Sequence, residues 1–177
     1  SITGTSEKKT GRIRLGMVGG GQGAFIGAVH RLAARMDDHY EFVAGALSSD
    51  AARSKASGEE LGLAPDRIYG DFREMAKAEA KRKDGIEAVS IVTPNHMHFP
   101  AAKAFIEAGI HVICDKPLSL NLKEALALEK LLAKNKNVIF ALTHNYSGYP
   151  MIRQARAMVA AGELGDIRGE ESRRRRA

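Results

Sequence analysis

Apolar and polar positions alternate along this chain in blocks that predict strands and helices in turn. The apolar run Ile13–Val18 predicts a buried strand that ends at three successive glycines, Gly19 to Gly21. After a short loop, apolar side chains recur at helical spacing from Ile26 to Met36. Strand, glycine-rich turn and helix in this order are the context in which a glycine motif predicts a dinucleotide site.

The alternation of strand and helix continues to about residue 161 and predicts the fold class. Asp50 and Asn121 are expected to cap helices, and Asp71 to start another. This rhythm predicts right-handed βαβ units in an α/β fold, a doubly wound parallel sheet (Rossmann fold) with strand order 3-2-1-4-5-6. Further strands are expected at Glu41–Leu47, Arg67–Tyr69, Ile86–Val92, His111–Cys114 and Val138–Leu142.

The glycine turn has the features of a phosphate-binding loop. Gly19 permits a tight turn, and Gly21 lets the backbone approach a pyrophosphate because it carries no Cβ. The helix that follows aims free N–H groups and its positive dipole end at the phosphates. The third small residue is Ala24 in a GxGxxA spacing, or Gly27 if the turn carries three extra residues. A glycine-rich turn that binds no ligand is the alternative.

The residues that could carry chemistry all follow predicted strands. In a parallel sheet the carboxyl ends of the strands share one edge, and the ligand crevice lies outside that edge. We therefore expect several distant segments to converge on one ligand. These segments are Gly19–Phe25, Ser48, Thr93–His98, Asp115–Pro117 and His144–Tyr146.

Composition is that of an ordinary globular domain, with 44% hydrophobic and 27% charged residues in 177. No apolar run approaches the ~20 residues of a membrane span. The polar residues 1–11 are expected to form a disordered tail without a signal peptide. The single cysteine, Cys114, excludes an internal disulfide and fits a cytoplasmic protein. Because it lies inside an apolar strand, we interpret it as a small buried hydrophobe rather than a nucleophile.

The net charge of +6 owes four charges to Arg173–Arg176. This run is either a phosphate-binding arm for nucleic acid or a solvated chain end. We favour the solvated end, because no aromatic residue or basic helix face accompanies the arginines. No nucleic-acid partner and no membrane partner are expected.

Two motifs, TPNHMH at Thr93–His98 and DKP at Asp115–Pro117, make the chain resemble the Gfo/Idh/MocA family of sugar and polyol dehydrogenases. The resemblance runs from Ile13 to Arg168. It also includes the glycine turn ending in IGAVH, the segment EAGIHVICDKP and the helix ending in AAGELGDIR. The resemblance implies an NAD(P)-dependent oxidoreductase that transfers a hydride between nicotinamide and a hydroxyl-bearing carbon of a sugar or polyol.

The resemblance also implies roles for individual residues. Lys116 would be the catalytic lysine, which reaches the substrate hydroxyl and the nicotinamide ribose and stabilises a developing alkoxide. Asp115 stands where the family has glutamate, and we expect function to survive the loss of one methylene. The expected cofactor-binding residues are Gly19, Gly21, Gln22, Ala24, Phe25, Ser48, Thr93, Pro94, Asn95, His98, Asp115, Lys116 and Asn145.

Ser48 stands where the family has an acidic residue that binds the adenosine ribose of NAD. A neutral side chain does not repel a 2′-phosphate, and Arg53 or Lys55 could help to bind one. The cofactor is therefore NAD or NADP, with NADP at least as favoured. Asp50 is interpreted as a helix cap and not as a ribose ligand.

Histidines near these motifs raise the question of a metal. His96, His98, Asp115 and His144 could approach one another at strand ends, but ligating histidines need fixed geometry and supporting hydrogen bonds. The resemblance accounts for His98 without a metal, so we expect no metal site. His30 is expected to pack or to hydrogen-bond within the first helix.

Members of the resembled family carry a second α/β domain that binds substrate, supplies further catalytic residues and mediates oligomerisation. The chain ends at Ala177, so we expect this domain to be essentially absent. The expected organisation is a dinucleotide-binding domain over residues 12–146, then a linking helix and a truncated start of the substrate domain over 147–177. The full-length enzyme is expected to be a homo-oligomer that acts on a sugar or polyol. The alternative is a dinucleotide-binding module or truncated fragment without turnover.

Overall fold

A computed structural model describes residues 11–166. Most of the tail expected to be disordered, and the arginine run, lie outside the described residues. The chain divides into two units, with the division after Thr143. The second unit begins with a 3₁₀ turn at Asn145–Gly148 and continues into α6 (Pro150–Ala160). The predicted domain boundary after residue 146 stays a prediction.

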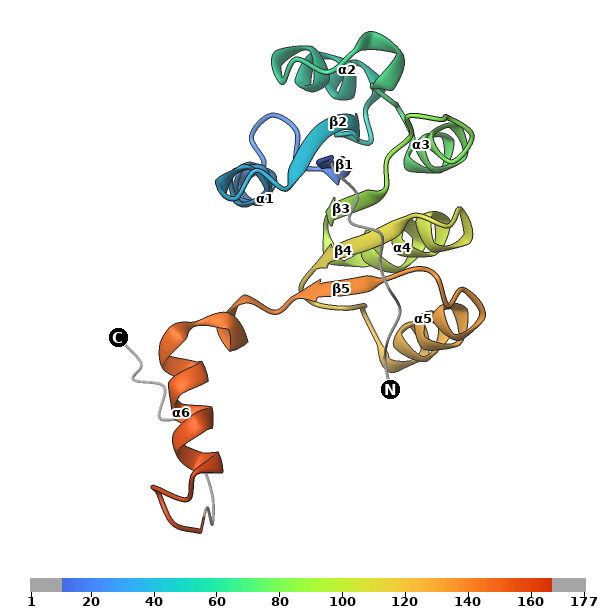
Figure 1. Cartoon of the computed structure of the whole chain (residues 1–177). Coiled ribbons are helices and arrows are strands. Elements are labelled where there is room, and N and C mark those ends of the chain that lie inside the picture. The colour runs from blue at the N-terminus through green and yellow to red at the C-terminus, as the bar shows by residue number, and fades with distance from the viewer. Residues whose placement is uncertain (1–10, 167–177) are drawn as a thin grey trace, which may run out of the picture. The chain divides into compact units, whose positions relative to one another are not determined.

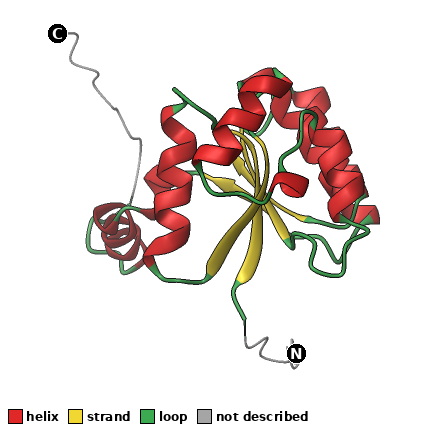
Figure 2. Cartoon of the chain, turned by 90° about the horizontal axis from the view of Figure 1, so that it is seen from above, coloured by secondary structure: helices red, strands yellow, loops and turns green. Residues whose placement is uncertain are grey.

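The first unit is built on one parallel sheet with strand order β2-β1-β3-β4-β5 (Figure 1). All four strand pairings are parallel, and the strands fan with the usual twist (Figure 2). Apart from one strand discussed below, this is the predicted order, and the doubly wound fold is confirmed. The strands are β1 (Ile13–Gly19), β2 (Tyr40–Ala46), β3 (Ala88–Val92), β4 (His111–Asp115) and β5 (Phe140–Thr143).

Helices lie on both faces of this sheet. One face carries α1 (Phe25–Met36), and α2 (Ala51–Glu60) lies at the β2 end of the sheet (Figure 1). The other face carries α3 (Phe72–Glu79), α4 (His98–Glu107) and α5 (Leu122–Lys134).

The predicted helix caps are confirmed. The side chain of Asp50 accepts a hydrogen bond from the backbone N–H of Arg53, and that of Asn121 accepts one from Glu124. Asp71 likewise accepts from the backbone N–H groups of the first turn of α3. These bonds satisfy donors that a helix start leaves without partners.

The predicted third strand, Arg67–Tyr69, is wrong. Pro65–Arg67 forms a 3₁₀ turn, and only Ile68 pairs with the sheet, through a single parallel bridge to Gly45. The physical reason lies in Arg67, whose side chain turns inward to an ion pair with Glu79. The ion pair of Arg67 fixes this segment, and Pro65 before it has no N–H to donate. The segment therefore makes few backbone hydrogen bonds to the neighbouring strand.

Two other strands begin two residues later than expected. The N–H of Ile86 donates to the carboxylate of Glu79 at 3.0 Å, so β3 starts at Ala88. The N–H of Val138 donates to the carbonyl of Asn135 in a turn at 2.9 Å, so β5 starts at Phe140. The N–H groups of Ile86 and Val138 are thus bonded outside the sheet, and the bonds to neighbouring strands begin with Glu87 and Ile139.

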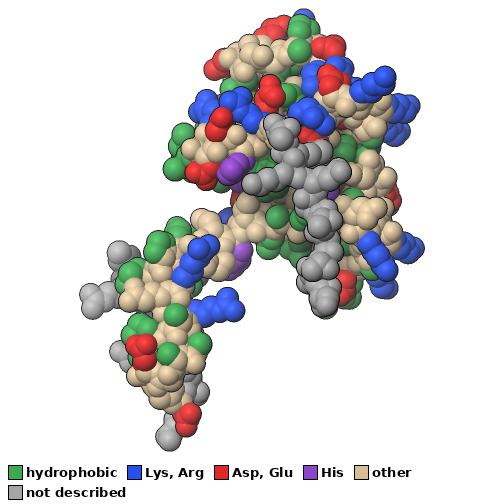
Figure 3. Space-filling view, viewed as in Figure 1, with side chains coloured by type: hydrophobic (Ala, Val, Ile, Leu, Met, Phe, Trp, Pro, Cys, Tyr) green, Lys and Arg blue, Asp and Glu red, His purple; other side chains and the backbone are tan. Residues whose placement is uncertain are grey.

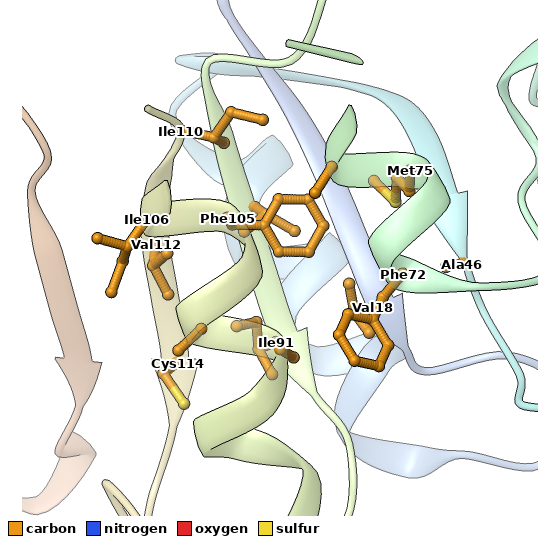
Figure 4. Packing of buried hydrophobic residues seen from close by; sticks show 14 of the residues in the cluster. Val18, Ala46, Phe72, Met75, Ile91, Phe105, Ile106, Ile110, Val112 and Cys114 are labelled. Carbon is orange, nitrogen blue, oxygen red and sulfur yellow. The ribbon is translucent and has the colours of Figure 1, made fainter. Parts of the chain in front are cut away.

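The main core lies between the sheet and the helices α3, α4 and α5 (Figure 4). Phe105 of α4 is fully buried there, close to Met75 of α3 and Ile91 of β3. Cys114 is buried in the same cluster, and burial raises the pKa of its thiol to about 12. The interpretation of Cys114 as a buried hydrophobe is confirmed, because a protonated and inaccessible thiol is a poor nucleophile.

Apart from the buried pair of Arg67 and Glu79, most charged side chains of the first unit lie on its outside. Figure 3 shows Lys and Arg side chains over the outer surfaces of α3 and α5. Within residues 11–166, no helix combines the length and the apolar character needed to cross a bilayer.

Candidate functional site

The strand register brings four of the five predicted segments to one edge of the sheet. Gly19, at the end of β1, pairs with Val92, directly before Thr93. In the neighbouring pair, Asp115 at the end of β4 lies opposite Thr143 of β5. The register also places the end of β2, and therefore Ser48, beside the end of β1. This convergence at the carboxyl edge is confirmed. The fifth segment, which contains the exposed Asn145, lies in the second unit.

The glycine turn packs too tightly for side chains. Gly19 has a φ of +80°, which a residue with a Cβ adopts only with strain. A Cβ on Gly27 would collide with the Cα of Gly20. Gly27 rather than Ala24 therefore takes the place of the third small residue of the motif. Its missing side chain lets the first turn of α1 pack against the glycine turn.

Gly21 is required for a different contact from the one expected. A Cβ there would lie 2.7 Å from the carbonyl oxygen of Leu47 and 2.8 Å from Oγ of Ser57. The N–H of Gly21 donates to the same Leu47 carbonyl at 3.1 Å. The missing side chain therefore lets the turn pack against the end of β2 and against α2.

The N-terminus of α1 presents N–H groups without a cap. Its N-cap residue, Ala24, offers no side-chain acceptor, and no acidic residue lies in the first turn. Helix geometry leaves the first N–H groups without intrahelical partners, and together with the dipole they favour an anion. A hollow of about 330 Å³ opens beside this turn, between α1 and α2.

The other residues predicted to bind the cofactor here differ in whether their polar groups are already hydrogen-bonded within the protein. Gln22 is engaged with α2, because its N–H donates to Ser57 Oγ at 3.1 Å and its amide donates to Glu60 at 2.7 Å. Phe25 is 81% exposed at the start of α1. Ser48 Oγ accepts from the N–H of Asp50 at 3.2 Å, and the Asp50 carboxylate caps α2. The interpretation of Asp50 as a cap is therefore confirmed.

Thr93 carries an unsatisfied polar atom at this edge. Its Oγ1 is buried and has no hydrogen-bond partner among the described residues. Such a group costs about 1–3 kcal/mol unless something supplies the missing bond. The hydroxyl lies in the loop beside Gly19, and Pro94 and Asn95 follow it, exposed. A donor-lined glycine cradle next to an unpaired hydroxyl fits a dinucleotide, whose phosphates and riboses accept and donate hydrogen bonds.

His98 is used inside the protein. It is 1% exposed, and its ring nitrogens lie 2.6 Å from the carbonyl oxygen of Pro117 and 3.0 Å from that of Thr93. The ring thereby joins the loop after β3 to the loop after β4. That His98 lines the nicotinamide half of a cofactor stays a prediction.

His30 is a residue of the site that sequence reasoning missed. It does not bond within α1 as expected, and its Nδ1 lies 2.8 Å from Oγ of Ser90 in β3. Its Nε2 lies 3.8 Å from the carboxylate of Asp115. Burial lowers the pKa of the ring, against the opposing pull of Asp115. Its position could have been inferred from its spacing, because Gly27 lies one helical turn earlier. The two residues therefore share the face of α1 that packs against the sheet.

Lys116 follows Asp115 and is exposed at the edge. Among the described residues, no carboxylate lies within 4.0 Å of its amine. Over residues 11–166, no cluster of three His, Cys, Asp or Glu side chains is arranged to hold a metal ion. An exposed ammonium beside a cofactor cradle is placed to stabilise negative charge on a bound substrate.

Comparison with known proteins identifies a family. A family model described as "Oxidoreductase family, NAD-binding Rossmann fold" matches residues 13–155. An uncharacterised oxidoreductase of Bacillus subtilis, YfiI, is 45% identical over 157 residues, which are 88% of this chain and 40% of that protein. Both findings cover the glycine turn and the two loops that follow β3 and β4.

Solved structures share the fold as well. An oxidoreductase of Sinorhizobium meliloti is 63% identical with a TM-score of 0.81, over 87% of this chain and 43% of that one. An inositol dehydrogenase homologue of Azotobacter vinelandii, solved with NAD+ and with NADH and myo-inositol, is 46% identical with a TM-score of 0.86. That match covers 92% of this chain and 42% of the homologue in the NAD+ complex. The chain thus spans about two fifths of the relatives it matches.

Proposed function

The chain belongs to the Gfo/Idh/MocA oxidoreductase family, a family with an NAD-binding Rossmann fold, and we propose that it forms the cofactor-binding half of an NAD(P)-dependent dehydrogenase. The reaction is hydride transfer between nicotinamide and a hydroxyl-bearing carbon of a sugar or polyol. One observation carries the proposal: the glycine turn, the unpartnered hydroxyl of Thr93 and the exposed Lys116 follow neighbouring strands at one edge.

Each element of this edge has its own task in the proposal. The N–H groups that begin α1 hold the pyrophosphate, and Thr93 gains the hydrogen bond that it lacks in the protein alone. Pro94 and Asn95 contribute to the nicotinamide side. The nicotinamide supplies the hydride acceptor when it is bound.

Lys116 is the proposed catalytic residue. Its neutral amine accepts the proton that the substrate hydroxyl loses, and the ammonium formed in this way stabilises the developing alkoxide. Thr143 Oγ1 donates a hydrogen bond to Asp115, whose carboxylate brings a negative charge next to the lysine in the sequence. A full-length homo-oligomer acting on a polyol such as the myo-inositol of the Azotobacter homologue is part of the same proposal.

The cofactor is NAD or NADP. Ser48 brings no carboxylate to the end of β2, so nothing at this position repels a 2′-phosphate. Arg53, in the first turn of α2, is the proposed phosphate partner, with Lys55 nearby. The homologue with bound NAD+ supports NAD as the cofactor. The side chains that follow β2 accommodate NADP equally well.

A direct test is a titration of the 177-residue chain with NADH and with NADPH, followed by nicotinamide fluorescence. We expect saturable binding that Thr93→Val weakens and that His39→Gln, an exposed substitution elsewhere, leaves unchanged. Absence of binding to either nucleotide would refute the proposal.

A second candidate is a dinucleotide-binding module without turnover. It is favoured by the site itself, because the glycine turn and Thr93 are assigned to the dinucleotide, whereas Lys116 is the one side chain of this edge assigned to chemistry. Incubation with NAD+ or NADP+ and a panel of polyols, read as NADH or NADPH formed, separates the two candidates. Binding without reduction supports the module, and polyol-dependent reduction that Lys116→Met abolishes supports the enzyme.

A further inference from the structure

His30 is a partly buried histidine that the proposed chemistry does not use. Its side chain is 11% exposed, and it reaches from α1 across the sheet to β3 and β4. We propose that His30 is a positioning residue: with Thr143 it holds the Asp115 carboxylate back from Lys116 and leaves the lysine amine unpaired. The catalytic meaning of this arrangement rests on the proposed function, whereas the arrangement itself does not.

The proton positions of His30 follow from its two neighbours. An ionised carboxylate can only accept, so the nitrogen that faces Asp115, Nε2, carries the proton. In the neutral ring, Nδ1 is then an acceptor, and the Ser90 hydroxyl donates to it at 2.8 Å. Ser90 is 1% exposed in the middle of β3, so this anchor is rigid. Ser90 therefore fixes the ring orientation, and the carboxylate that Nε2 then faces favours the tautomer.

Asp115 is held from two sides. Thr143 Oγ1 donates to Asp115 Oδ1 at 2.9 Å. Nε2 of His30 lies 3.8 Å from the same oxygen, which is beyond hydrogen-bond length, so its pull is electrostatic. Within residues 11–166, His30 is the one basic side chain within 4.0 Å of this carboxylate. Both attractions act on the same oxygen, Oδ1.

Burial makes His30 suited to this task. The desolvated ring has a lowered pKa and is neutral near neutral pH. A neutral ring orients the carboxylate through its N–H dipole without cancelling its charge, as a lysine or arginine would. The negative charge therefore remains at the edge while its position is fixed.

The tautomer gives the first test. Nitrogen-15 NMR of the histidine side chains of the full chain is expected to report His30 as the Nε2–H tautomer, with Nδ1 unprotonated. Ser90→Ala removes the donor to Nδ1 and is expected to mix the two tautomers. A wild-type His30 with the proton on Nδ1 would overturn the proposal, because Nε2 would then face the carboxylate with a lone pair.

The reactivity of Lys116 gives the second test. Trace acetylation by acetic anhydride, read by mass spectrometry, compares Lys116 with the exposed Lys77 in the same molecule. In His30→Leu, Asp115 is freer to pair with Lys116, and a paired ammonium reacts more slowly than a free amine. We expect up to about fivefold slower acetylation, the factor that an exposed ion pair of ~1 kcal/mol gives.

Two further variants separate positioning from general damage. His30→Gln keeps an N–H donor toward Asp115 and is expected to restore the Lys116 rate. Thr143→Val removes the other partner and is expected to slow it, and it carries this test if His30→Leu does not fold. Equal Lys116 rates in all folded variants would overturn the proposal. Neither measurement uses a nucleotide, so a failed NADH titration would leave this result standing.

Discussion

Two polar networks of the first unit are built from similar side chains, yet only one is closed. Glu79 is 1% exposed and accepts hydrogen bonds from Arg67, from the hydroxyl of Tyr69 at 2.8 Å and from the N–H of Ile86 at 3.0 Å. Burial, then the bond to Glu79, raises the pKa of Tyr69. The charged and polar side chains of Arg67, Tyr69 and Glu79 therefore all have hydrogen-bond partners within the protein.

The network at the carboxyl edge is open. Among the described residues, Thr93 Oγ1 has no hydrogen-bond partner, the start of α1 has no side-chain cap, and no carboxylate lies within 4.0 Å of the Lys116 amine. Buried polar groups are normally satisfied, so the closed network is explained by stability alone. The open one leaves the buried hydroxyl of Thr93 unpaired and presents N–H groups and an ammonium at the surface, where a ligand can bind them. The difference separates polar residues that hold the fold from those that await a partner.

Breaking the closed network is expected to have the largest effect. Glu79→Gln leaves the 7% exposed Arg67 with only the exposed carboxylate of Asp84, 3.8 Å away, as an ion-pair partner, which costs about 3 kcal/mol of unfolding free energy. Urea denaturation followed by circular dichroism measures the loss. The exposed Glu74→Gln on the same helix is the control and is expected to change stability by no more than about 0.5 kcal/mol. A similar small loss for both variants would mean that Arg67 and Glu79 contribute no more than surface charges.

Distorting the glycine turn is expected to affect both stability and binding. Gly27→Val forces α1 away from Gly20, which costs ~2 kcal/mol by overpacking. Because the N–H groups of α1 move with the helix, NADH affinity is expected to fall about tenfold or more. Ala33→Val, at an exposed position of the same helix away from the hollow, is the matched control. If Gly27→Val left NADH affinity unchanged, the glycine turn would not be the cofactor-binding site.

A single hydroxyl sharpens the comparison at the edge. Thr93→Val removes the unpartnered Oγ1 and is expected to leave the unfolding free energy equal or higher, while NADH affinity falls about fivefold. Thr143→Val removes a hydroxyl that donates to Asp115, and it is expected to lower stability by ~1 kcal/mol. If Thr93→Val destabilised the protein as much as Thr143→Val, its hydroxyl would have a partner within the fold.

Local patterns predicted most of the architecture. Continuous apolar runs marked the strands, since β3 is buried at all five positions, and Asp50, Asp71 and Asn121 marked the helix starts by capping chemistry. The register of a parallel sheet then brought the motif residues to one edge without further information.

What the sequence could not predict depends on tertiary pairing. The third strand was lost because Arg67 pairs with Glu79, twelve positions later in a helix. The role of His30 depends on Ser90, sixty positions away and adjacent only in the folded sheet. Gly21 was assigned to a phosphate by its motif, whereas its packing against Leu47 and Ser57 appears only in three dimensions.

The smallest expected effect concerns pH and again contrasts the open edge with the closed network. Burial lowers the pKa of His30 below the 6.5 of a free histidine, and Asp115 opposes this shift only in part. As the pH falls through about 6.5, the unfolded chain therefore binds a proton that the folded ring does not, and the free energy of unfolding decreases. The decrease begins below the unfolded pKa and ends once the pH is below the folded pKa.

Urea denaturation at about pH 7.5 and about pH 5.5 measures this linkage. The wild type is expected to lose more stability on acidification than His30→Gln, with a difference of less than ~1 kcal/mol. His39→Gln, which removes an exposed histidine, is expected to follow the wild type. A larger loss in His30→Gln than in the wild type would require a raised pKa for His30. Asp115 would then attract the imidazolium strongly enough to outweigh burial, and the carboxyl edge would be a closed ion pair like that of Glu79.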